Sequence, residues 1–233
     1  MSGEALQRRY HEVRERIARA CQRSGRDPAT VGLVAVSKQQ PAEALAALAA
    51  LGQRVFGESY LQEALSKQAV LAHLPLEWHF IGPLQGNKTR LVAEHFAWVH
   101  SVDRERIARR LSEQRPEALG PLQVCIQVNL SGEASKSGVE PEALVPLAEF
   151  VEACPRLQLR GLMTLPARNE DLERQRRPFA RLRELKQRLA DHLGRPLDTL
   201  SMGMSADLEA AVLEGATWVR VGTALFGPRP PRP

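Results

Sequence analysis

Apolar residues recur every three or four positions at the start of the chain and then gather in short continuous runs. The first pattern predicts an amphipathic helix over residues 4–24, which Gly25 and Pro28 end. The run VGLVAVS (31–37) is rich in β-branched residues and predicts a buried strand. The segment PAEALAALAALG (41–52) has proline in its first turn and glycine at its end, which is typical of a helix.

The same alternation of strand and helix continues along the chain. Seven further strands are predicted at 54–58, 77–82, 97–102, 122–130, 157–163, 198–202 and 218–222. Helices are predicted between them at 59–72, 86–95, 103–115, 141–153, 170–193 and 206–215, with none after the last strand. Strands that alternate with helices run parallel, with the helices outside the sheet.

Eight such units in about 200 residues are what a (β/α)8 TIM barrel needs. We therefore predict an α/β fold, a single TIM barrel with an additional N-terminal helix. An open doubly wound sheet is the alternative, because a count of strands does not prove that the sheet closes. The sequence has no G-x-G-x-x-G or Walker A pattern, which weakens the nucleotide-binding form of that fold. No Gly/Ser-rich linker interrupts residues 1–233, which we expect to form one domain with a disordered tail at 228–233.

Composition is that of a globular protein, with 43% hydrophobic and 25% charged residues. The apolar runs fall short of the ~20 residues that a membrane helix needs, and the charged N-terminus lacks the apolar core of a signal peptide. The three cysteines have no C-x-x-C spacing, so neither a disulfide framework nor a metal site is expected. We expect a cytoplasmic protein that does not bind a membrane.

The net charge of +5, from 32 Lys and Arg against 27 Asp and Glu, raises the question of nucleic acid. Basic residues are densest over 171–195, where acidic residues lie among them. This mixture is typical of the solvated face of an amphipathic helix, so we do not expect nucleic acid as a partner.

The active site of a TIM barrel lies at the carboxyl ends of its strands, so the residues there are the candidates for chemistry. Lys38 follows the first strand and shares a face with Val34 and Val36. A lysine in this place is partly desolvated, and its neutral amine could form a Schiff base with a carbonyl compound. The alternative is a lysine that extends into solvent from a strand end.

The last two strands end in small and hydroxyl-bearing residues. Gly222 and Thr223 follow the eighth strand, in which Arg220 is predicted to be buried and to need an acceptor, either a carboxylate or a ligand atom. At the end of the seventh strand, Ser201 and then Ser205 precede a helix predicted to begin near Ala206, with Ser205 as its N-cap. Loops at these two places are the recurrent phosphate site of TIM barrels.

A lysine, a phosphate site and an inward arginine together indicate a ligand with an aldehyde, a phosphate and a polar ring atom. Pyridoxal 5′-phosphate (PLP) has all three. Lys136, after the fifth strand, could contact an anion near the mouth or be a solvated loop residue.

The chain also resembles the YggS/PROSC-type pyridoxal phosphate homeostasis protein family. The matching stretches follow one another over nearly the whole length, and they are LVAVSK (33–38), FGESYLQE (56–63), WHFIGPLQGNK (78–88), SKSG (135–138), RGLMTLP (160–166), SMGMSADLEAA (201–211) and VRVGTALFG (219–227).

The resemblance implies a barrel of the alanine-racemase N-terminal-domain type in which Lys38 carries PLP as a Schiff base. It implies that groups around Met204, Ser205, Gly222 and Thr223 hold the phosphate and that Arg220 faces the pyridine nitrogen. The sequence departs from the family pattern at Ser59, where FGEN is common, and at Gly86, where LQSNK is common. Ser59 remains among the expected cofactor contacts.

An arginine opposite the pyridine nitrogen leaves PLP a weak electron sink, which disfavours much PLP chemistry. Racemisation needs an acid or base on each face of the substrate, and beside Lys38 the candidates are Tyr10, expected in the core, and Tyr60, near the mouth. We therefore expect a monomeric, non-enzymatic PLP-binding protein that supplies PLP-dependent apo-enzymes. The alternatives are a PLP-dependent racemase of low activity, an aldolase-like Schiff-base enzyme acting on sugar phosphates, and a basic nucleic-acid-binding module.

Overall fold

The computed structural model of the chain describes residues 3–131 and 137–228 and contains a closed barrel of eight parallel strands. The strands follow in chain order around the barrel, and the last pairs with the first, with Leu33 opposite Val219. They are β1 (Gly32–Val36), β2 (Val55–Glu58), β3 (Glu77–Phe80), β4 (Trp98–Val102), β5 (Leu122–Gln127), β6 (Leu157–Met163), β7 (Thr199–Ser201) and β8 (Trp218–Val221). The closed ring confirms the predicted TIM barrel and excludes the open sheet.

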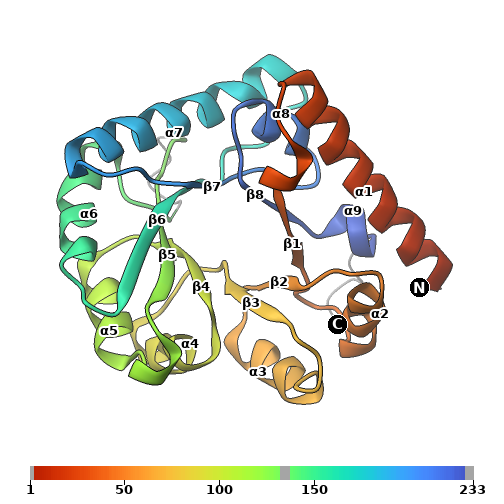
Figure 1. Cartoon of the computed structure of the whole chain (residues 1–233), viewed down its shortest axis with the longest axis horizontal. Coiled ribbons are helices and arrows are strands. Elements are labelled where there is room, and N and C mark those ends of the chain that lie inside the picture. The colour runs from red at the N-terminus through yellow and green to blue at the C-terminus, as the bar shows by residue number, and fades with distance from the viewer. Residues whose placement is uncertain (1–2, 132–136, 229–233) are drawn as a thin grey trace.

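Helices surround the strands, as Figure 1 shows. The α-helices are α1 (Gly3–Arg23), α2 (Ala42–Ala50), α3 (Leu61–Val70), α4 (Thr89–His95), α5 (Glu105–Gln114), α6 (Leu144–Glu152), α7 (Leu172–Leu193), α8 (Leu208–Leu213) and α9 (Thr223–Phe226). Short 3₁₀ helices are η1 (Pro28–Thr30), η2 (Gly86–Lys88), η3 (Glu117–Leu119) and η4 (Pro141–Ala143). Local signals set their ends: the Asp171 side chain caps the start of α7, and left-handed Gly194 ends it.

Helix α9 corrects one prediction, since no helix was expected after the last strand. It has four residues, which is one helical turn and too short for an apolar repeat to reveal it. The predicted tail at 228–233 lies, beyond Pro228, outside the described residues. Within the described part of the chain, no helix is both long and apolar enough to cross a lipid bilayer.

The additional helix α1 lies outside the ring and packs against α8 and α9 (Figure 1). Its predicted stripe, Leu6, Tyr10, Val13, Ile17 and Cys21, is buried, so Tyr10 is a core residue as expected. Beside this stripe, Arg16 reaches the loop after β7 and the start of α8, where it bonds the Ser205 carbonyl and the Glu209 carboxylate. The first helix of the chain therefore supports the last two strand–helix units.

Strand residues alternate between the helix layer and the barrel axis. Leu33 and Ala35 of β1 belong to the main apolar core, which fills the space between strands and helices. A smaller apolar cluster, formed around Trp98, Cys125 and Met163, is separate from that core. The barrel interior also contains polar and charged side chains. His79, His100, Ser201 and Arg220 are buried there and are joined by hydrogen bonds.

Candidate functional site

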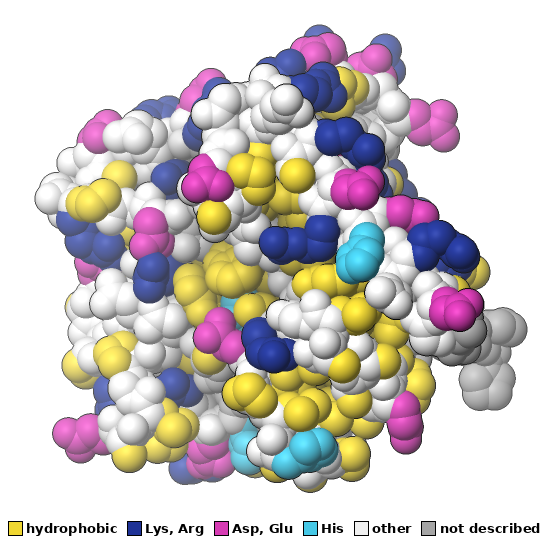
Figure 2. All heavy atoms as spheres, turned by 45° about the vertical axis from the view of Figure 1, so that its right-hand side comes forward, with side chains coloured by type: hydrophobic (Ala, Val, Ile, Leu, Met, Phe, Trp, Pro, Cys, Tyr) yellow, Lys and Arg dark blue, Asp and Glu magenta, His cyan; other side chains and the backbone are white. Residues whose placement is uncertain are grey.

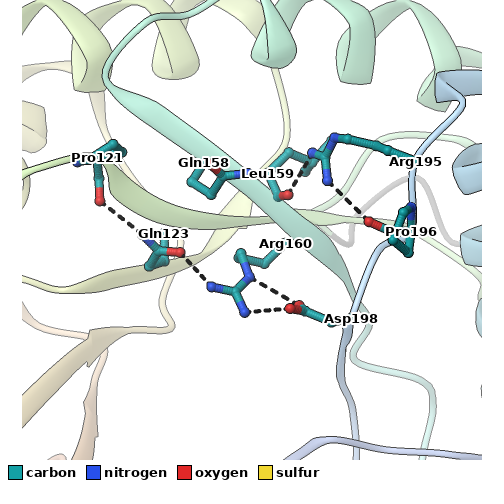
Figure 3. Close-up of a pocket in the computed structure, with 8 residues that line it drawn as sticks. All are labelled: Pro121, Gln123, Gln158, Leu159, Arg160, Arg195, Pro196 and Asp198. Carbon is teal, nitrogen blue, oxygen red and sulfur yellow. Dashed lines mark hydrogen bonds and ion pairs between the residues drawn. The ribbon is translucent and has the colours of Figure 1, made fainter.

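A cavity of about 660 Å³ opens at the carboxyl ends of the strands, where the sequence predicted the site. Of the residues predicted to bind a cofactor, seven line this cavity: Lys38, Ser59, Met204, Ser205, Arg220, Gly222 and Thr223. Ser201 does not line the cavity. Its hydroxyl oxygen instead accepts a hydrogen bond from Arg220, which does. A second cavity, of about 420 Å³, lies at the opposite end of the barrel, where Pro121, Gln123, Arg160, Arg195 and Asp198 line it (Figure 3).

Lys38 is placed at the cavity by the strand before it. Val36 lines the same cavity, which confirms that the two side chains share a face. The intervening Ser37 points the other way, is completely buried, and donates from Oγ to Glu58 Oε1 at 2.6 Å. Lys38 therefore faces the cavity, while the residue before it belongs to a buried polar cluster.

That cluster is centred on Lys67 of α3, whose side chain is buried. Its Nζ donates to the Ser37 carbonyl at 2.6 Å and to Glu58 Oε1 at 2.7 Å. Glu63 also pairs with Lys67 and accepts a hydrogen bond from the Gln39 amide. Both neighbours of Lys38 in the chain are thus held by one set of charges, which we call the Lys67 cluster (Ser37, Gln39, Glu58, Glu63 and Lys67).

The Lys67 cluster holds an unusual backbone conformation and a costly buried charge. Gln39 has φ of 64°, in the left-handed region that non-glycine residues rarely adopt. Glu58 is completely buried, and its Oε2 receives no hydrogen bond from the residues that the structure describes. Burial raises the pKa of Glu58, and the charge and hydrogen bond of Lys67 oppose that rise.

Arg220 of β8 is buried and lines the cavity at the same time. Its Nη1 donates to Ser201 Oγ at 2.6 Å and its Nη2 to the Thr164 carbonyl at 2.9 Å. From the sequence, its acceptor could be a carboxylate or a ligand atom, and the structure provides a hydroxyl and a carbonyl instead. Burial lowers the pKa of Arg220 to about 10, so the guanidinium keeps its charge at neutral pH.

The loops after β7 and β8 meet at the cavity wall. Ser205 Oγ accepts a hydrogen bond from the Ala224 amide at 3.1 Å, which joins the two loops. The loop after β7 also lies close against α8, where a Cβ on Gly203 would lie 2.5 Å from the Ala211 Cβ. Hydroxyls and backbone of two adjoining loops are suited to hold an anion such as a phosphate.

The structure corrects the predicted role of Ser205 as a helix cap. Helix α8 begins at Leu208, later than expected, and Asp207 stands at its N-cap position. The Asp207 carboxylate accepts a hydrogen bond from the Met204 amide at 2.6 Å. Ser205 belongs to the turn before the helix, where its hydroxyl faces the neighbouring loop.

Several residues of the site were missed by the sequence analysis. Arg168 and Asn169 also line the cavity, from a loop with no periodic signal, and so does Asp207, which the sequence placed in the predicted helix at 206–215. Tyr60 lines the cavity and is 45% exposed. Gly86 begins η2 and is not among the lining residues, whereas Lys136 lies outside the described residues.

His79 and His100 lie inside the barrel and contact each other, with His79 Nδ1 2.9 Å from His100 Nε2. Within residues 3–131 and 137–228, no group of three or more His, Cys, Asp or Glu side chains could hold a metal ion.

Figure 2 shows one face of the molecule, on which basic and acidic side chains are interspersed over its upper part.

Comparison with known proteins relates the chain to PLP-binding barrels. The family described as alanine racemase, N-terminal domain, matches residues 8–230. A pyridoxal phosphate homeostasis protein of Pseudomonas aeruginosa is 65% identical over 218 residues, which are 94% of this chain and 93% of that protein. The protein of the same name from Escherichia coli K12 is 51% identical and covers 94% of both chains.

Two solved structures place the fold among proteins of this type. PipY of Synechococcus elongatus, in a structure with PLP bound, is 41% identical, with a TM-score of 0.81, over 92% of this chain and 100% of that chain. Alanine racemase from Corynebacterium glutamicum is 19% identical, with a TM-score of 0.73, over 97% of this chain and 62% of that chain. The second likeness concerns the fold alone.

Proposed function

The chain belongs to the pyridoxal phosphate homeostasis protein family and to the alanine racemase N-terminal domain family, and from this premise we propose that it binds PLP in the cavity at the carboxyl ends of its strands. The observation that carries the proposal is that Lys38, Arg220 and the joined loops after β7 and β8 all line one cavity. An amine, a fixed cation and an anion cradle match the aldehyde, ring nitrogen and phosphate of PLP.

We assign each part of the cofactor to residues of this chain. Lys38 would hold the aldehyde end of PLP, because its amine can condense with an aldehyde to a Schiff base with loss of water. Hydroxyl and backbone groups of Met204, Ser205, Gly222 and Thr223 hold the phosphate. A Cβ on Gly222 would lie 3.2 Å from the Val36 carbonyl, so the close packing of β8 against β1 favours a small residue at this point of the wall. Ser59 completes the wall at β2.

The proposed role is storage and delivery of PLP without catalytic turnover. When bound, PLP supplies an electron-withdrawing ring. Arg220 only donates hydrogen bonds, so the ring nitrogen opposite it would accept one and stay unprotonated. A ring in that state withdraws electrons weakly, which disfavours transamination and decarboxylation and leaves racemisation as the competing enzymatic role. PLP-dependent apo-enzymes of the cytoplasm are the proposed recipients, and the free, buried state of all three cysteines agrees with a reducing compartment.

A PLP-dependent racemase of low activity is the second candidate, because Tyr60 also lines the cavity. A tyrosine and Lys38 could act on opposite faces of an amino acid. The assay is conversion of L-alanine to D-alanine by the loaded protein. We expect no sustained turnover, and turnover that Tyr60→Phe removes would establish the racemase in place of the carrier.

The Schiff base is tested by borohydride reduction of the PLP-loaded protein and mass spectrometry of its peptides. Borohydride reduces a C=N bond to a stable amine and so fixes the cofactor to its lysine. We expect the pyridoxyl group on the peptide that contains Lys38. A modification confined to another lysine would contradict the assignment, and the absence of any bound PLP would contradict the proposed function.

Arg16 is expected to support PLP binding from outside the cavity. Its Nη2 donates to the Ser205 carbonyl at 2.9 Å, so Arg16→Ala frees a loop proposed to hold the phosphate. The loss of one such hydrogen bond, about 1 kcal/mol, corresponds to a roughly fivefold weaker PLP affinity. Equilibrium dialysis against PLP measures the affinity.

The control for this prediction is Arg19→Ala, one turn along the same helix. Arg19 is 67% exposed at its side chain and pairs only loosely with Glu15, at 3.7 Å. We expect its PLP affinity to equal that of the wild type. Equal affinities for the wild type, Arg16→Ala and Arg19→Ala would show that Arg16 does not support the site.

A further inference from the structure

A continuous chain of hydrogen bonds crosses the barrel interior from Arg220 to the opposite end. Arg220 Nη1 lies 2.6 Å from Ser201 Oγ, which lies 2.6 Å from His100 Nδ1. His100 Nε2 lies 2.9 Å from His79 Nδ1, and His79 Nε2 lies 2.8 Å from Glu77 Oε1. We call these five residues, Arg220, Ser201, His100, His79 and Glu77, the cross-barrel chain.

The cross-barrel chain joins the cavity to solvent at the amino ends of the strands. Its members come from β8, β7, β4 and β3. Ser201, His100 and His79 are completely buried, whereas the Glu77 side chain is 45% exposed. Trp98 stacks on His79, and Trp218 meets it edge-on, with ring centroids 5.3 and 5.1 Å from the imidazole. Aromatic packing therefore holds the buried histidines in a single arrangement.

The charges at the two ends give the cross-barrel chain one direction. Arginine only donates hydrogen bonds, and an ionised carboxylate only accepts them. Burial lowers the pKa of both histidines, that of His100 well below its ordinary value, so both rings are neutral. The hydrogen bond from His79 lowers the pKa of Glu77, which is therefore ionised.

With both ends fixed, only one assignment of protons satisfies every bond. His79 must donate from Nε2 to Glu77, so its Nδ1 accepts from His100 Nε2. His100 Nδ1 then accepts from the Ser201 hydroxyl, whose oxygen is left to accept from Arg220. The reverse order would set a lone pair of His79 against the Glu77 carboxylate.

We propose that Glu77, His79 and His100 are positioning residues that orient Arg220 through Ser201 for its contact with PLP. This inference rests on the proposed function, since the ring nitrogen of PLP is the group that Arg220 would face. Ser201 Oγ accepts from Arg220 best when its own proton is directed to His100. The carboxylate at the far end of the barrel thus determines how firmly the guanidinium is held at the cavity.

The test is Glu77→Gln, which keeps the size of the side chain and removes its charge. An amide both donates and accepts, so the reverse order of protons becomes available. Nitrogen-15 NMR of the protein without PLP identifies the protonated ring nitrogen of each histidine. We expect Nε2 alone to be protonated in both rings of the wild type, and Nδ1 to be protonated in part of the Glu77→Gln population.

The same variant is expected to change PLP binding, although Glu77 lies outside the cavity. We expect a roughly threefold to tenfold weaker PLP affinity, the size that the loss of one buried hydrogen bond gives, and a shifted visible absorption of bound PLP. The matched control is Asp198→Asn at the same end of the barrel. Asp198 pairs with Arg160, which also donates a hydrogen bond to Gln123 (Figure 3). None of these three residues belongs to the cross-barrel chain.

A pair of variants at His100 separates positioning from packing. The amide oxygen of His100→Asn takes the place of Nδ1 and still accepts from Ser201, whereas His100→Leu fills the space with no acceptor. We expect His100→Asn to bind PLP more tightly than His100→Leu, because only the first restores the bond to Ser201.

The outcomes distinguish the two proposals. A wild-type protein that binds no PLP would overturn the proposed function, and this inference with it. A wild-type protein that binds PLP while Glu77→Gln matches Asp198→Asn in affinity, absorption and histidine protonation would overturn the inference alone. Equal PLP affinities of His100→Asn and His100→Leu would also overturn it.

Discussion

Replacing Lys38 by alanine is expected to abolish the covalent bond between the protein and PLP. Lys38 is the lysine that lines the cavity among the described residues, so its removal takes away the amine that condenses with the aldehyde. Borohydride reduction should then leave the protein unmodified at this site, and the yellow colour of the loaded protein should disappear. We also expect the PLP affinity to fall by at least about tenfold, because only the phosphate and ring contacts remain.

Two further variants make this result specific. Lys38→Arg keeps the positive charge but has no nucleophilic amine, because a guanidinium does not lose its proton in proteins. This variant should also fail to form the adduct. Lys88→Ala removes a lysine at the end of η2, away from the lining residues, and should behave as the wild type. An adduct of wild-type yield in Lys38→Ala would contradict the site.

Replacing Lys67 by methionine is expected to destabilise the fold strongly. Methionine has a similar length, but it leaves the completely buried Glu58 without its cation. Breaking a buried ion pair from one side costs about 3–5 kcal/mol, a large part of the free energy of unfolding of a typical domain. For a chain of this length the melting temperature should fall by roughly 10 °C, which calorimetry measures.

The cost of Lys67→Met should depend on pH in a predictable direction. Burial already raises the pKa of Glu58, and without Lys67 it rises further. A carboxyl whose folded-state pKa is raised contributes stability below its unfolded pKa of about 4.3 and loses it as the pH rises through the folded value. The difference in unfolding free energy from the wild type should therefore be smallest near the acid end and grow toward neutral pH.

A second replacement checks that the buried charge is the cause. The double variant Glu58→Leu with Lys67→Met removes both members of the pair, and we expect it to unfold at a higher temperature than Lys67→Met alone. Arg19→Met breaks an exposed pair on α1 and should change the unfolding free energy by less than about 0.5 kcal/mol. A double variant no more stable than Lys67→Met would contradict this explanation.

The strands and most of the site could be predicted from the sequence because both depend on local signals. Runs such as VGLVAVS mark a strand by composition, and in a TIM barrel the residue after a strand has a known place. Lys38, Arg220 and Thr223 were found in this way, and the structure brings them together at one cavity. Helix α9 and the later start of α8 were missed, because one or two turns carry too short a pattern.

Contacts between strands distant in sequence could not be predicted. His79 and His100 were expected on strands, but whether their side chains meet depends on the register between β3 and β4 and on closure of the ring. The acceptors of Arg220 come from β7 and from the end of β6, and no spacing in the chain relates them. Ser37, Glu58 and Lys67 likewise look ordinary in sequence, and only their burial makes them a cluster.

The position of α1 determines when this helix can complete its packing during synthesis on the ribosome. Helix α1 is synthesised well before its main partners α8 and α9, and Arg16 is separated from Glu209 by 193 residues. Until those segments emerge, the apolar stripe of the nascent helix can pack only against its near neighbours η1 and α2, and β1 has no β8 to pair with. A growing chain of this kind therefore exposes apolar surface and an unpaired strand edge until β8 and α9 have been synthesised, the condition under which nascent chains tend to aggregate.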